Sequence, residues 1–65
     1  MYNDGKSMVE FYAELRRETE HAYLLFDGAY EIWIPISQVD EFESVNGVDY
    51  KVSVPEWLAK KKGII

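Results

Sequence analysis

The sequence predicts a small, mainly β domain with one short C-terminal helix. Several segments alternate apolar and polar residues with a period of two, which is typical of half-buried strands. Asp-Gly and Asn-Gly, the dipeptides that favour tight turns, separate such segments. The chain has 65 residues, of which 48% are hydrophobic and none is cysteine, so apolar packing has to stabilise it without disulfides. We expect a four-stranded antiparallel bent sheet, or a partly open SH3-like or OB-like barrel, forming a single domain over residues 1–65.

A loose N-terminal segment over residues 1–7 is expected to precede the first strand, because Asn3, Asp4 and Gly5 are turn formers. The first strand is predicted over Met8–Arg17, where apolar and polar residues alternate. A helix is the rival interpretation, because the segment is rich in helix formers. The helical face would end on an arginine and leave Phe11 outside it, so a strand is favoured.

A β-hairpin is the next predicted unit. Its strands, His21–Asp27 and Ala29–Pro35, meet at Asp27-Gly28, where glycine supplies the positive φ of a tight turn. The expected core face holds Ala22, Leu24, Phe26, Tyr30, Ile32 and Ile34, and the opposite face holds His21, Tyr23, Leu25, Glu31 and Trp33.

The remaining chain predicts one more strand and a helix. Ile36–Val45 is irregular, with a helical turn that Ser37 could cap, and Asn46-Gly47 marks a turn. A strand is expected over Val48–Val54, with Val48, Tyr50, Val52 and Val54 inward and Asp49, Lys51 and Ser53 outward. A short helix is expected over Pro55–Lys62, with the proline at the first helical position, Trp57 and Leu58 docked on the sheet, and Gly63 as the stop.

The residues that chemistry needs do not form a recognisable catalytic or metal pattern. The glycines are isolated, no serine lies in a nucleophile elbow, and His21 is the one histidine. Carboxylate pairs such as Glu18/Glu20 and Asp40/Glu41 lack the spacing of a calcium loop. We therefore expect no enzyme activity, no metal and no cofactor. The lack of cysteine and of a long apolar run favours a cytoplasmic location without membrane contact.

Charge is segregated along the chain. The net charge is −5, and the segment from Glu18 to Tyr50 contains eight acidic residues but no lysine or arginine. A surface of this kind repels nucleic-acid phosphate and attracts basic protein patches. A plain solubility surface is the alternative explanation of this pattern.

Two segments carry a resemblance to a known group of proteins. Glu18–Val39 (ETEHAYLLFDGAYEIWIPISQV) and Val52–Ile64 (VSVPEWLAKKKGI) resemble short proteins of phages and mobile elements. These proteins share a Glu-Thr-Glu, an apolar strand, Trp-Ile-Pro, a Ser-Gln pair and a closing Pro-Glu-Trp-Leu helix. Small acidic proteins of such elements include anti-CRISPR inhibitors, so the resemblance implies an inhibitor of a nucleic-acid-binding complex in the cytoplasm of a bacterial host.

The leading functional expectation is a non-enzymatic inhibitor whose acidic face docks on the nucleic-acid-binding surface of a defence complex of the CRISPR type. The partner-binding residues expected from the sequence are Glu18, Glu20, Tyr23, Asp27, Glu31, Trp33, Asp40, Glu41 and Glu43. One alternative is a structural or regulatory module that forms a homodimer through Trp33. Another is an OB-like protein whose aromatic residues stack on nucleic-acid bases, which the net charge opposes.

Overall fold

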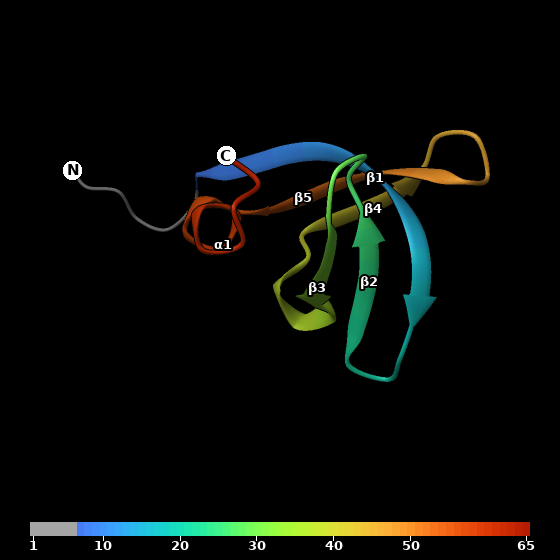
Figure 1. The fold of residues 1–65 in the computed structure, drawn as a ribbon. Helices are drawn as coiled ribbons and strands as arrows, with labels where there is room; N and C mark the ends of the chain where they lie inside the picture. Colours follow the sequence, from blue (N-terminus) through green and yellow to red (C-terminus); the bar gives the residue numbers. More distant parts are fainter. Residues whose placement is uncertain (1–6) are drawn as a thin grey trace.

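The computed structural model describes residues 7–65 as one antiparallel sheet followed by a short helix (Figure 1). The elements are β1 (Met8–Glu18), β2 (Ala22–Phe26), β3 (Glu31–Pro35), the 3₁₀ turn η1 (Ile36–Gln38), β4 (Glu41–Ser44), β5 (Asp49–Pro55) and α1 (Glu56–Lys61). The five strands lie in the order β3-β2-β1-β5-β4. The mainly β class, with an open antiparallel sheet and one C-terminal helix, is therefore confirmed, but the sheet has one strand more than expected. The loose segment predicted for the N-terminus lies outside the described residues, except for Ser7.

β1 is the long central strand, so Met8–Arg17 forms a strand and not a helix. From Met8 to Glu14 it pairs with β5, and from Glu14 to Glu18 it pairs with β2. The register shifts between Leu15 and Arg17, and a bulge of this kind bends a strand and increases its twist. Figure 1 shows the resulting curve of β1 over the other strands.

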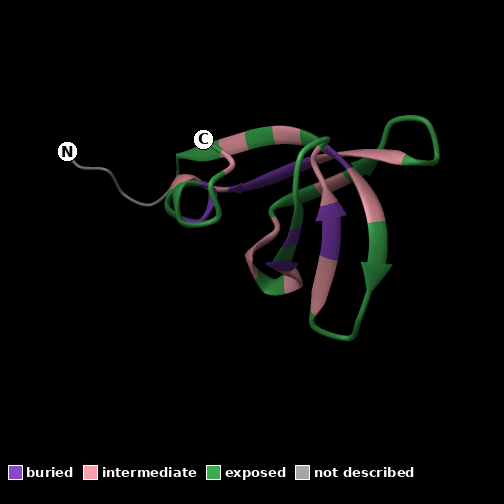
Figure 2. Ribbon diagram, viewed as in Figure 1, coloured by how far each residue is buried: buried purple, intermediate pink, exposed green. Residues whose placement is uncertain are grey.

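The core lies on the concave side of the bent sheet. Leu25, Ile34, Val52 and Val54 are fully enclosed there, and Leu58 and Ala59 of α1 are buried in the same cluster (Figure 2). Phe42 of β4 stacks on Tyr23 of β2, with ring centroids 4.2 Å apart, and on Tyr50 of β5 at 4.3 Å. This aromatic stack brings edge strand β4 over β2, which lies in the other half of the sheet. The sheet therefore closes partway, although β3 and β4 form no ladder with each other.

Both predicted turns are present, and side-chain oxygens organise them. Asp27 Oδ1 accepts hydrogen bonds from the N–H groups of Ala29 and Tyr30, each at 2.8 Å, and Gly28 has φ 101°. Asn46 Oδ1 accepts from Val48 and Asp49 in the β4–β5 turn. Local turn chemistry therefore forms both hairpins.

The facing predicted for β2 is wrong. Tyr23 lies opposite Ile34 and Leu25 opposite Ile32, and directly paired residues share one face of a sheet. Tyr23 and Leu25 therefore face the core, whereas Leu24 shares the outer side with Trp33. The inward placement of Tyr30 and Val48 is also wrong, because they lie beyond the strand ends and are 74% and 56% exposed.

α1 begins one residue later than predicted, with Pro55 as the residue before its first turn, and Ser37 makes no capping hydrogen bond at η1. The helix ends at Lys61, and Gly63 follows as the predicted stop, with φ 78°. Ile64 N–H then donates a hydrogen bond to the carbonyl of Ala59 at 2.8 Å. Leu58 docks as expected, but Trp57 is 53% exposed. Within residues 7–65, no helix has the length and apolar character that crossing a bilayer requires.

Candidate functional site

The outer side of β1, β5 and β4 carries most of the carboxylates that the sheet brings together. Cross-strand partners share a face, so the register places Glu10, Ser53 and Glu41 in one row and Tyr12, Lys51 and Glu43 in the next. Glu14 and Asp49 form a third row. We call these carboxylates the acidic face: Glu10, Glu14, Glu41, Glu43 and Asp49.

Lys51 lies at the centre of the acidic face. Its Nζ is 3.9 Å from a carboxylate oxygen of Glu10 and 3.9 Å from one of Glu43. At these distances, and with exposed partners, each ion pair contributes little to stability. Glu14 also pairs with Arg16, but Lys51 cannot neutralise the other four carboxylates, so this side of the sheet keeps a negative potential.

Arg16 forms the border between the acidic face and the β2–β3 side of the sheet. Its guanidinium carbon lies 4.4 Å from the centre of the Phe26 ring. The same side chain lies 3.1 Å from Glu14 and 3.6 Å from Glu31. The cation–π contact and the two ion pairs hold three strands together on the outer side, and they partly neutralise these two glutamates.

The residues expected from the sequence do not form one surface. Glu41 and Glu43 belong to the acidic face, Glu31 lies beyond Arg16, and Asp40 precedes β4. Glu18 and Glu20 lie at the β1–β2 connection, where a carboxylate oxygen of Glu20 is 3.4 Å from His21 Nε2, and Asp27 lies at the β2–β3 turn. The acidic run in the sequence is therefore spread over several ends of the fold.

Of the two aromatic residues expected as anchors, only Trp33 faces outward. It is 44% exposed on edge strand β3 and lies opposite buried Leu24. Tyr23 is half-buried in the aromatic stack, so its predicted place on an outer surface is wrong. Tyr12, 64% exposed beside Lys51, is the aromatic side chain that the acidic face does present.

Sequence reasoning missed Glu10 and Glu14 as part of the site. The alternation in Met8–Arg17 already placed both outside, next to Tyr12. A count of charge along the chain does not include them, because they precede the acidic run. The pairing of β1 with β5 is what joins them to Glu41 and Glu43.

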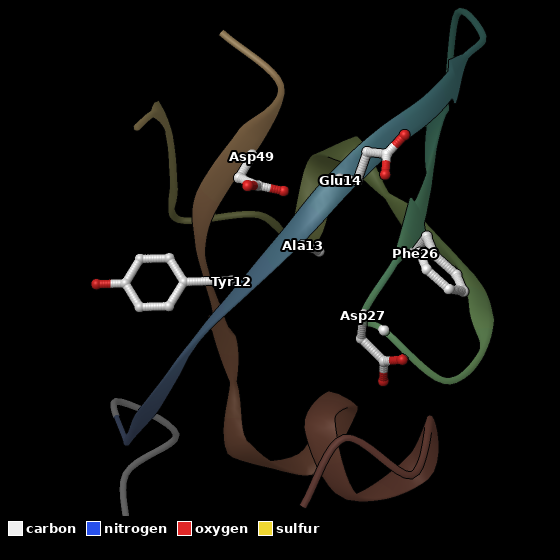
Figure 3. A pocket seen from close by; sticks show the side chains of 7 residues that line it. Tyr12, Ala13, Glu14, Phe26, Asp27 and Asp49 are labelled. Atoms are coloured by element: carbon white, nitrogen blue, oxygen red, sulfur yellow. The ribbon is translucent and has the colours of Figure 1, made fainter. Parts of the chain in front are cut away.

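A shallow hollow of about 290 Å³ lies beside the acidic face, lined by Tyr12, Ala13, Glu14, Phe26, Asp27, Gly28 and Asp49. Figure 3 shows β1 passing between Tyr12 and Asp49 on one side and Phe26 and Asp27 on the other. Asp27 accepts hydrogen bonds from the backbone N–H groups of Tyr30 and Ala29, and these bonds keep the pKa of its carboxyl group below the ordinary value. Among the residues described, no group of three or more His, Cys, Asp or Glu is placed to hold a metal ion.

Comparison with family models finds no match, and neither do comparisons with curated proteins and with solved structures.

Proposed function

We propose that this protein is a non-enzymatic inhibitor that binds another protein through its acidic face. The partner proposed is the basic, nucleic-acid-binding surface of a defence complex of the CRISPR type in the bacterial cytoplasm. The observation that carries this proposal is the arrangement of five carboxylates around Lys51 on one side of the sheet.

Physical considerations support this mode of action. A groove that binds nucleic acid is lined with lysine and arginine, so a rigid array of carboxylates is complementary to it. The five carboxylates come from paired strands, so little conformational freedom of the backbone is lost on binding. Complementary charge also raises the association rate, and this effect weakens as salt is added.

The experiment compares two double variants with equal net charge. Glu41→Lys/Glu43→Lys reverses charge on the acidic face, and Glu18→Lys/Glu20→Lys makes the same change at the β1–β2 connection. We expect the first to weaken binding to a purified CRISPR effector complex at least about tenfold, and to restore cleavage of target DNA, because close interfacial charge pairs are lost. The second should change binding less than about threefold. Equal effects of the two variants, or full inhibition by the first, would contradict the proposal.

A homodimer is the second candidate, and the exposure of Trp33 on an edge strand favours it. An exposed tryptophan beside unpaired backbone groups is typical of a protein interface. Sedimentation over a range of concentrations distinguishes this candidate. A mass that rises toward the dimer for the natural protein, and stays at the monomer value for Trp33→Arg, would support it.

A further inference from the structure

We propose that the free edge of β1 at Glu10 and Tyr12 binds an extended basic segment of a partner protein as an added antiparallel strand. This inference rests on the proposed function for the basic character of the partner. The edge itself follows from the pairing of the strands.

The first step is that the N-terminal half of β1 is paired along one of its two edges only. Up to Glu14, β1 pairs with β5 on one side, and only from Glu14 onward does it pair with β2 on the other. Within the part of the chain that the structure describes, the β2 side of Met8–Ala13 therefore pairs with no strand. Within residues 7–65, no strand or turn supplies a hydrogen bond to this edge.

The second step identifies which backbone groups point to that edge. Glu56 N–H donates to the carbonyl of Ser7 at 3.0 Å, in the same register as the β1–β5 pairing, so Ser7 directs its backbone toward β5. Backbone groups along a strand alternate between the two edges, so Val9 and Phe11 also face β5. Glu10 and Tyr12 therefore direct their N–H and C=O groups to the open side.

The third step is that there is room beside this edge. The hollow described above borders Tyr12 and Ala13 on β1 and reaches Phe26 and Gly28 at the hairpin. A Cβ built on Gly28 would meet no atom within 4 Å, so the corner of the hairpin leaves space. Figure 3 shows the Asp27 side chain on the hairpin side of β1.

The fourth step is the chemistry of the occupant. The residues that line the hollow include Glu14, Asp27 and Asp49 and no lysine or arginine. Arg16 lies next to this lining and pairs with Glu14, which leaves Asp27 and Asp49 without a basic partner among residues 7–65. Side chains of an added strand opposite Glu10 and Tyr12 would lie on the outer side, between the carboxylates of Glu10 and Glu14 and beside the Tyr12 ring. Lysine or arginine fits these positions by charge and by contact with the ring.

The side chains between these basic positions would lie on the other side of the added strand, next to half-buried Val9 and Phe11, and should be aliphatic. The expected segment therefore alternates basic and aliphatic residues. A second copy of this chain is a poor occupant, because its free edge strands β3 and β4 carry Glu31, Glu41 and Glu43.

The test uses a capped Lys-Val-Lys-Val-Lys peptide, titrated at low salt into the ¹⁵N-labelled protein. We expect the largest amide shifts at Glu10 and Tyr12. N-methylation of the central lysine, whose N–H would face β1, should weaken binding at least about fivefold, because an edge hydrogen bond is lost. N-methylation of a valine, whose N–H faces away, is the matched control and should change binding less than about twofold.

Equal effects of the two methylated peptides, or the absence of binding by the parent peptide, would overturn the proposal. So would hydrogen exchange in the free protein that is as slow at Glu10 and Tyr12 as at Phe11, since this edge would then be covered. A dimer that Tyr12→Pro abolishes would assign the edge to a second copy, which also overturns it. Glu41→Lys/Glu43→Lys should leave peptide binding within about threefold, so failure of the edge and failure of the proposed function give different results.

Discussion

At the scale of single residues, Asp27 combines a structural and an electrostatic role. Its carboxylate accepts two backbone hydrogen bonds in the β2–β3 turn, both of which favour the ionised form. These bonds lower its pKa in the folded protein, so folding is linked to its loss of a proton. Its stabilising contribution is fully present above the ordinary carboxyl pKa of 3.8 and is lost as pH falls through the folded pKa.

Replacement of this carboxylate should therefore have a pH-dependent effect. Asp27→Ala is expected to lower the melting temperature at pH 7, because the N–H groups of Ala29 and Tyr30 lose their acceptor. The difference from the natural protein should shrink in thermal scans taken at successively lower pH below about 3.8. Asp27→Asn, which retains an acceptor oxygen, is the control, and its melting temperature at pH 7 should lie between those of the natural protein and Asp27→Ala. A difference that stays constant down to pH 2 would contradict this account.

Two valines near each other in the sequence test the facing of the last strand. Val52 is fully enclosed in the core, whereas Val48 is 56% exposed before β5 begins. Val52→Ala should lower the free energy of unfolding by about 2 kcal/mol, from lost burial and the cavity left behind. Val48→Ala, the same chemical change, should cost less than about 0.5 kcal/mol. Urea denaturation measures both, and similar losses would show that Val48 packs inward after all.

At the scale of elements, features that depend on neighbouring residues could be predicted from the sequence, whereas features that depend on pairing between distant strands could not. The Asp27-Gly28 and Asn46-Gly47 turns were predictable because a few neighbouring atoms form each turn. β4 was missed because Glu41–Ser44 contains one apolar residue, Phe42, and is a strand only through its partner β5. The facing of β2 was ambiguous because Leu24 and Leu25 are adjacent, and the register with β1 and β3 decides between them.

The contact that holds β4 over β2 gives a prediction at this scale. Phe42 lies between Tyr23 and Tyr50, nearly parallel to both, with interplanar angles of 6° and 9°. Phe42→Ala should lower the free energy of unfolding by about 3 kcal/mol, since burial and both aromatic contacts are lost. Phe42→Leu retains most of the apolar volume and should cost about 1 kcal/mol.

Chemical denaturation measures these two losses. Hydrogen exchange of the β4–β5 ladder then shows whether β4 opens first in the alanine variant. A loss below about 0.5 kcal/mol for Phe42→Ala would mean that the aromatic stack does not hold the two halves of the sheet together.

At the scale of the whole molecule, negative potential is assembled by folding. Glu10 and Glu14 precede the acidic run in the sequence, yet pairing of β1 with β5 places them on the side that Glu41 and Glu43 occupy. Glu18 and Glu20, inside that run, lie at a different end of the sheet. A count of charge along the chain therefore predicts that the surface is negative, but it identifies only some of the residues that form the acidic face.

Crowding of like charges on this face leads to a prediction about stability. Among residues 7–65, Glu41 forms no ion pair, and it shares the outer side of the sheet with Glu10 and Glu43. Glu41→Gln should therefore raise the free energy of unfolding by about 0.3 kcal/mol at low ionic strength, because repulsion is relieved. Glu31→Gln is the matched control. It should lower the free energy of unfolding, since it removes the ion pair with Arg16. Both differences should fall toward zero in about 0.5 M salt, where exposed charges are screened over a few ångströms. Urea titrations at low and high salt measure the four values, and stabilisation by Glu41→Gln that persists in high salt would mean that charge repulsion is not its cause.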